Sequence, residues 1–206
     1  ILAINRAPRA VEKHGLKPVP AALEMRQRLD SLRIKWLSEG KPEIRIGMGV
    51  ATDSAIVGNV GSSTRLNYTA MGDGVDLADT LEVATKLYRV AIIISENTWI
   101  QSREEVLTRE LDLVKVEGHA RPLRIFEAVE ARAGATDRQK SVTDQFHQGL
   151  ALYRQRRWDD AGRIFQQVLT LQPDDGPGKL FLDRCAHAKA HPPGPDWDGA
   201  TEAAGH

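Results

Sequence analysis

The chain has a single cysteine, no long apolar run and no excess of charge of either sign. One cysteine, Cys185, excludes a disulfide within the 206 residues and suits a reducing compartment. No stretch is long and apolar enough to span a bilayer. The 28 basic and 28 acidic residues cancel, whereas a nucleic-acid-binding protein needs a surplus of cations to neutralise phosphates. We therefore expect no nucleic-acid partner.

What the chain does contain is enough apolar sequence for a packed core. Hydrophobic residues make up 41% and charged residues 27%, so the composition is that of a folded domain and not of a disordered segment. The length suits one domain with an appendage or one slightly large domain. Cys185 is interpreted as a small buried helix residue, because only His187 and His191 lie near it and no second thiol can complete a metal site.

Hydrophobic periodicity divides the first part of the chain into alternating helices and strands. Residues 9–20 contain Pro18 and Pro20 and are predicted to be a loop. Helices are predicted over 21–38, 75–88 and, after a Ser95 cap, up to residue 100. Strands are predicted over 44–50, 55–60, 67–71, 90–94, 110–116 and 123–129. Asp73 is interpreted as an N-cap in the turn before the second helix. This order indicates an α+β layer with an antiparallel sheet.

The last third of the chain changes character. Residues 131–143 are small and polar and are predicted to be a linker, residues 144–190 are predicted to be helical, and residues 191–206 to be extended. The first domain is therefore placed at 1–130. Because the chain opens with the apolar run Ile1–Ile4 and not with Met, we expect the natural N-terminus to lie upstream.

Three motifs follow one another in the first domain: IRIGMGV at 44–50, VGNVGS at 57–62 and YTAMGD at 68–73. Their order and spacing strongly resemble the class III adenylate/guanylate cyclase catalytic domain, and the resemblance covers roughly residues 1–130. Residues 1–4 with Ala7 and Pro8 resemble the family segment just after its second metal-binding carboxylate. The resemblance therefore implies that both metal aspartates and the purine-reading lysine of the family lie outside this chain.

The resemblance also implies a fold and a reaction. The fold would be a ferredoxin-like antiparallel sheet with packed helices, truncated at its start. The family reaction, that of a phosphorus-oxygen lyase, converts ATP to cyclic AMP and pyrophosphate in signal transduction. It uses Mg²⁺ or Mn²⁺, whose ligands are not in this chain, and a head-to-tail dimer partner that is identical or different. Two metal ions activate the ribose hydroxyl, and donors from the partner hold the charge that develops on the phosphoryl group.

At the positions of those donors, this sequence departs from the family. Asp76 stands at the family asparagine, Thr80 at the arginine, and Glu117 at the hairpin lysine, with His119 two residues on. An anion at 76 repels a triphosphate, and Thr80 cannot supply a charged, bidentate fork. Thr69 stands at the purine-selecting position, where the resemblance implies the adenylate type. No carboxylate pair elsewhere replaces the metal ligands, so we assign no metal residue.

The helical segment resembles one tetratricopeptide repeat (TPR). Gly149, Ala161, Phe165 and Pro173 fall at repeat spacing, although one repeat cannot bury its own faces. A plain helical hairpin and a docking module for a protein partner stay equally open. The same ending is typical of bacterial membrane-tethered sensor cyclases, which implies a cytoplasmic domain, at the inner end of a membrane-anchored receptor.

Three functional hypotheses follow. The first is a degenerate cyclase homology domain with a regulatory role, as the non-catalytic half of a pair. The second is an active adenylate cyclase completed by an absent N-terminal segment and a dimer partner. The third is a protein-interaction module that acts through the helical tail.

Overall fold

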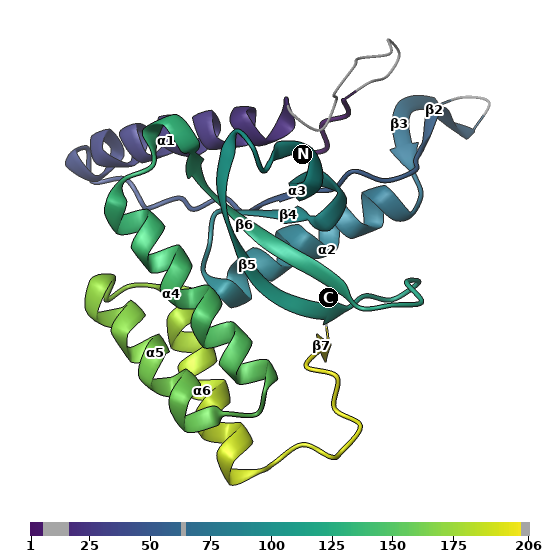
Figure 1. Ribbon diagram of the computed structural model, residues 1–206. Helices are drawn as coiled ribbons and strands as arrows, with labels where there is room; N and C mark the ends of the chain where they lie inside the picture. The colour runs from purple at the N-terminus through teal and green to yellow at the C-terminus, as the bar shows by residue number, and fades with distance from the viewer. Residues whose placement is uncertain (6–16, 63–64, 203–206) are drawn as a thin grey trace.

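The computed structural model describes residues 1–5, 17–62 and 65–202. Its helices and strands, labelled in Figure 1, have the bounds that follow. The helices are α1 (Pro18–Ser38), α2 (Asp73–Tyr88), α3 (Glu96–Ser102), α4 (Asp137–Arg154), α5 (Trp158–Leu171) and α6 (Gly176–Ala190). The strands are β1 (Met48–Val50), β2 (Ile56–Ser62), β3 (Arg65–Met71), β4 (Ile92–Ser95), β5 (Val106–Lys115), β6 (Leu123–Ala131) and β7 (Thr201–Glu202). This mixture of helices and strands confirms the α+β class.

The main sheet is mixed, so the prediction of a purely antiparallel sheet is wrong. Its five strands have the order β1-β4-β6-β5-β7. The three inner neighbours β4, β6 and β5 are antiparallel, whereas β1 runs parallel to β4 and β7 runs parallel to β5. The two edge strands, β1 and β7, pair with strands that do not neighbour them in sequence. Periodicity within each strand does not reveal which strands pair.

β2 and β3 form a separate two-stranded hairpin, paired in register from Ile56↔Met71 to Ser62↔Arg65. The first two strands therefore do not pair with each other, although only a short turn separates them. β1 instead lies against α2, where a Cβ on Gly49 would meet the Ala78 carbonyl oxygen at 2.0 Å. Only glycine permits this approach, and it leaves β1 to pair with Ile92–Ile94.

The N-terminal third differs from prediction in two more ways. The predicted strand 44–50 is regular only over β1, and Ile44 and Ile46 are exposed. The predicted loop 9–20 ends earlier than expected, because Pro18 occupies the first turn of α1, where its missing N–H costs nothing. Residues 9–16 of that loop, and Ala7 and Pro8 of the family resemblance, lie outside the described residues.

Helices cover both faces of the main sheet. On one face α1 and the α3 residue Trp99 pack against Ile92, Ile94 and Phe126. The side chains that alternate with these, such as Ile93 and Ile125, lie on the other face. There α2 and the three C-terminal helices share one apolar cluster with the sheet. The C-terminal helices are thus part of the core of this domain.

The predicted linker 131–143 is wrong from residue 137 onward, because α4 begins there. Thr136 and Gln139 form a capping box, in which the Thr136 hydroxyl accepts from the Gln139 backbone N–H and the Gln139 side chain accepts from that of Thr136. Val142 and Phe146 are buried one turn apart. The small, polar opening of the segment concealed this apolar stripe.

The end of the chain folds back over the domain as a strap, residues 191–202 (yellow in Figure 1). Arg156 donates to the carbonyl oxygens of Gly194 and Pro195 at 2.6 and 3.1 Å. Trp197 packs against Tyr153 and Trp158. The strap ends in β7, so the prediction of an extended terminus is right for most of it and misses this short parallel pairing; residues 203–206 lie outside the described part.

Candidate functional site

The two candidate positions Asp76 and Thr80 lie on the early turns of α2. Gly72, with φ of +124°, is the N-cap, so Asp73 is the first helical residue and its predicted role as N-cap is wrong. Asp73 and Asp76 still suit the helix dipole. Asp76 is exposed, and its backbone carbonyl accepts the Thr80 hydroxyl at 2.9 Å. The Thr80 hydroxyl is thereby used within its own helix.

Thr80 also faces the end of the strap. It lines a small cleft together with Val114, Ile125 and Glu202. The neighbouring cation, Lys115, lies 3.8 Å from Glu202 and 3.9 Å from Asp198. The Thr80 side chain therefore shares this cleft with the carboxylate of Glu202.

Thr69 lies on β3, the strand that leads into α2. It is half-buried and stands opposite Gly58 in the β2–β3 register. The hairpin projects from the body of the molecule (Figure 1) and leaves large apolar side chains exposed on both of its strands. These side chains are Ile56, Val60, Leu66, Tyr68 and Met71.

Glu117 and His119 lie in the turn between β5 and β6. Gly118 has φ of +81°, a conformation that L side chains rarely adopt, and the His119 N–H closes the turn on the Val116 carbonyl oxygen at 3.1 Å. Glu117 is exposed and His119 is half-buried. Among the described residues, only Asp76 and Thr80 of the five candidates are joined by a hydrogen bond, and none of the five belongs to an ion pair.

The described residues do not fit the two-metal site that the resemblance implies. Nowhere in 1–5, 17–62 and 65–202 do three or more His, Cys, Asp or Glu side chains stand close enough to hold a metal ion. Mg²⁺ and Mn²⁺ require several oxygen ligands. No chemical step is therefore derived through a metal on this chain.

Two buried charge networks, which sequence reasoning missed, join the sheet to the C-terminal helices. In the first, Arg109 of β5 has 4% of its side chain exposed and contacts Glu127 at 2.6 Å and Asp175 at 2.7 Å. Its guanidinium also lies 4.9 Å from the centroid of Phe146. These two carboxylates outweigh the burial that opposes the charge, so the pKa of Arg109 is raised.

The second network is centred on Asp112 of β5, which is 1% exposed. Its Oδ2 accepts from the Tyr88 hydroxyl at 2.7 Å, from Arg184 at 2.6 Å and from the Thr201 hydroxyl at 2.9 Å. Burial and the adjacent Asp112 raise the pKa of Tyr88 above its usual range. One carboxylate thus ties together α2, α6 and β7. The signal that the sequence offered was weak, because β5 carries four charged residues and only Arg109 and Asp112 of them are buried.

Within the described residues, no helix is both long and apolar enough to cross a membrane.

No protein-family model matches the chain. Among curated proteins, it is 29% identical over 175 residues to "Adenylate cyclase, terminal-differentiation specific" of Dictyostelium discoideum. It is 35% identical over 129 residues to "Adenylate cyclase 1" of Rhizobium meliloti (strain 1021). These matches cover 83% and 63% of this chain, but only 8% and 19% of the two relatives. The first match is longer than residues 1–131, so it includes part of the C-terminal helices.

Two solved structures share the fold. The adenylyl cyclase CyaB from P. aeruginosa matches with a TM-score of 0.55 and 29% identity over 63% of this chain and 67% of that one. The guanylate cyclase domain of RhGC from Catenaria anguillulae, solved in complex with GTP, has a TM-score of 0.52 at 20% identity, over 62% and 66% of the two chains. Because the identity to RhGC is only 20%, that similarity shows a shared fold and nothing more.

Proposed function

Because the chain carries a domain of the adenylate/guanylate cyclase family, we propose that it acts as a degenerate, regulatory half of a cyclase pair. The observation that carries this proposal is the chemistry on α2 and the β5–β6 turn. Asp76, Thr80 and Glu117 offer no cation where the family reaction requires positive charge and hydrogen-bond donors. Removing one such donor costs roughly two to three orders of magnitude in rate.

The geometry supports this reading beyond the residue types. The Thr80 hydroxyl is bonded to the Asp76 carbonyl, and the adjacent Glu202 adds a second anion. The charge of the nearby Lys115 is balanced by Asp198 and Glu202 of the strap, which lie 3.9 and 3.8 Å from it. A triphosphate brought to this surface would meet carboxylates.

The partner in this proposal is a head-to-tail cyclase subunit, and the nucleotide of the pair is ATP. The purine preference rests on Thr69 and on the adenylate cyclases among the relatives. Mg²⁺ or Mn²⁺ would be held by the partner, since this chain lacks a suitable set of ligands. Placement in the cytoplasm, and the TPR-like character of the C-terminal helices, belong to the same proposal.

The test measures cyclic AMP formed from ATP and Mn²⁺ by this protein mixed with a partner domain. The partner keeps both metal aspartates but has its own asparagine and arginine replaced, so turnover requires the α2 surface of this chain. The parent is compared with Asp76→Asn, Thr80→Arg, Glu117→Lys. A control with the same charge change at exposed sites carries Asp137→Asn, Gln167→Arg, Glu105→Lys.

We expect the parent and the control to be silent and the first triple variant to be active. Turnover by the parent mixture would refute degeneracy and favour the second hypothesis, an active cyclase completed by other segments. Silence of all three, together with the absence of a complex in sedimentation, would refute the role as half of a pair.

A further inference from the structure

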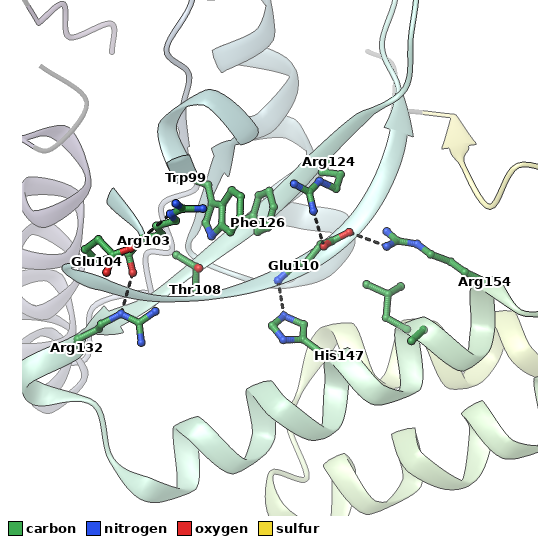
Figure 2. Close-up of a pocket in the computed structure, with 12 residues that line it drawn as sticks. Trp99, Arg103, Glu104, Thr108, Glu110, Arg124, Phe126, Arg132, His147 and Arg154 are labelled. Atoms are coloured by element: carbon green, nitrogen blue, oxygen red, sulfur yellow. Dashed lines mark hydrogen bonds and ion pairs between the residues drawn. The ribbon is translucent and has the colours of Figure 1, made fainter. Parts of the chain in front are cut away.

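A second polar site lies on the opposite side of β5 from the charge networks. It is a cavity of about 570 Å³ between α3, the β5–β6 ribbon and α4. Figure 2 shows two groups of charged side chains in it, one around Arg103 and Arg132 and one around Arg124 and Arg154, with an aromatic pair between them. None of the five candidate positions of the cyclase surface lines this cavity.

The aromatic pair forms an apolar wall for the cavity. Trp99 and Phe126 are stacked, with ring centroids 4.6 Å apart and planes inclined by 2°. The guanidinium carbons of Arg103 and Arg124 lie 5.4 and 5.2 Å from the Trp99 centroid. Cation–π contacts of this kind hold the planar arginine groups in place without neutralising their charge.

The cavity carries more positive than negative charge. Four arginines line it, against the two carboxylates Glu104 and Glu110. His147 adds no charge, because its Nε2 accepts the backbone N–H of Glu110 at 2.8 Å and so is unprotonated. The lining residues therefore have an excess of two positive charges, and Glu96, which stands beside them 2.5 Å from Arg124, reduces this excess to one.

Several polar groups of the cavity have no hydrogen-bond partner, most of them arginine N–H groups. The Nε and Nη2 of Arg154 are buried without a hydrogen bond, and so is the Oε1 of Glu110, which lies 2.7 Å from the Nη1 of Arg154. Arg132 uses its Nε on the Arg103 carbonyl oxygen at 2.8 Å, and within the described residues its two terminal nitrogens meet no carboxylate. The buried, unpaired donors of Arg154 are costly unless an acceptor approaches them, whereas the exposed terminal nitrogens of Arg132 are open to solvent and to a ligand.

These observations point to an anion as the missing acceptor. Guanidinium forks match the oxygen geometry of phosphate better than that of any neutral ligand. The volume falls within the range of roughly 300–1,000 Å³ that is usual for small-molecule sites. The two arginine groups at opposite ends suit a ligand with more than one anionic group, and the aromatic wall suits an apolar body. We propose that this cavity binds a small phosphate-bearing polyanion, at a site separate from the cyclase surface.

The experiment follows the four tryptophan indole N–H signals of the ¹⁵N-labelled chain while tripolyphosphate, and separately ATP, is added. Trp99→Phe assigns the Trp99 signal. We expect a saturable shift of that signal with tripolyphosphate, one that weakens as KCl is raised because salt screens the attraction. If ATP binds more tightly than tripolyphosphate, we infer that the apolar wall contacts the base of a nucleotide. If the two bind with equal affinity, we infer that the ligand is an inorganic polyphosphate. Both outcomes support the proposed chemistry.

Three variants locate the ligand. Arg132→Gln, on an exposed side chain, and Arg154→Gln should each raise the dissociation constant about tenfold or more, as expected for a lost charge-assisted contact. Arg132→Lys should recover part of the affinity, because it keeps the charge and loses the fork. Arg163→Gln, which removes an exposed arginine of α5 that pairs with Asp160 and does not line the cavity, is the matched control.

The proposal is overturned if the Trp99 signal does not shift saturably, or if Arg132→Gln binds as the parent does. A shift that Arg163→Gln weakens equally would also overturn it, because the binding would then reflect overall charge. No turnover is measured, so failure here is distinguishable from failure of the proposed cyclase role.

Discussion

The pair Asp174 and Asp175 offers a direct test of how the C-terminal helices are held. Asp175 has 1% of its side chain exposed, lies 2.7 Å from the buried Arg109, and caps α6 by accepting the Gly178 N–H at 2.7 Å. Its neighbour Asp174 is fully exposed and lies 3.7 Å from Lys179. The two residues have the same chemistry and adjacent positions, and differ only in burial and partners.

The expected effect of Asp175→Ala follows from those contacts. Removing one partner of a buried ion pair costs about 3–5 kcal/mol, and we take the lower end because Arg109 keeps Glu127. Loss of the N-cap adds about 1 kcal/mol. The total of about 4 kcal/mol is a large part of the roughly 5–15 kcal/mol that stabilises a domain. Asp174→Ala should cost less than about 1 kcal/mol, as exposed pairs do.

Urea unfolding of the parent, Asp175→Ala and Asp174→Ala, monitored by circular dichroism, measures these differences in the free energy of unfolding. Asp175→Asn keeps the capping oxygen but removes the charge, so it should fall between the two alanine variants. Amide hydrogen exchange should show α4–α6 and the β4–β6 strands of the parent opening together, since they share one core. The reasoning is refuted if Asp175→Ala unfolds within about 0.5 kcal/mol of Asp174→Ala, or if the helices of the parent exchange while the sheet stays protected.

Three further outcomes follow from local contacts. Burial lowers the pKa of His147. As pH falls below about 6.5, the unfolded chain therefore takes up the proton first, and stability is progressively lost until the pH reaches the pKa of the folded state. His147→Gln keeps an acceptor for the Glu110 N–H, and it should flatten this pH dependence in melting temperatures measured from pH 7 to 5. Gly149→Ala should destabilise by about 1–3 kcal/mol in urea, because its Cβ would meet the Phe165 ring at 2.7 Å; a neutral result would show that the two helices can separate. Burial raises the pKa of the Cys185 thiol to about 12, so a thiol reagent at pH 8 should label the unfolded chain quickly and the native chain slowly; rapid native labelling would contradict the buried placement.

Much of the fold could be predicted because its signals are local. The periodicity of 75–88 located α2, and Ser95 was expected to cap α3, where its hydroxyl indeed accepts the Thr98 N–H at 3.3 Å. The hairpin turn at Glu117–His119 was correctly placed between β5 and β6. The motif positions Asp76 and Thr80 lie on α2 as expected, while their catalytic consequence stays a prediction.

The long-range features could not be read from the sequence. The parallel pairing of β1 with β4 depends on Gly49 meeting α2, and nothing near Gly49 identifies that neighbour. The predicted strand 110–116 contained Asp112 and excluded Arg109, and periodicity does not distinguish a solvated charge from one paired inside the core. Their partners Asp175 and Arg184 are 66 and 72 residues away.

The same contacts place the C-terminal helices next to the elements of the proposed cyclase surface. Tyr88 ends the helix that carries Asp76 and Thr80, and its hydroxyl is bound to Asp112, while a Cβ on Gly176 would meet the Tyr88 carbonyl oxygen at 2.2 Å. β7 pairs with the end of β5 just before the turn that carries Glu117. Any partner that moved the C-terminal helices would have to bind the displaced arrangement more tightly than the docked one. Since both buried networks oppose that displacement, we expect signals to reach α2 through motion of the helices and sheet as one body.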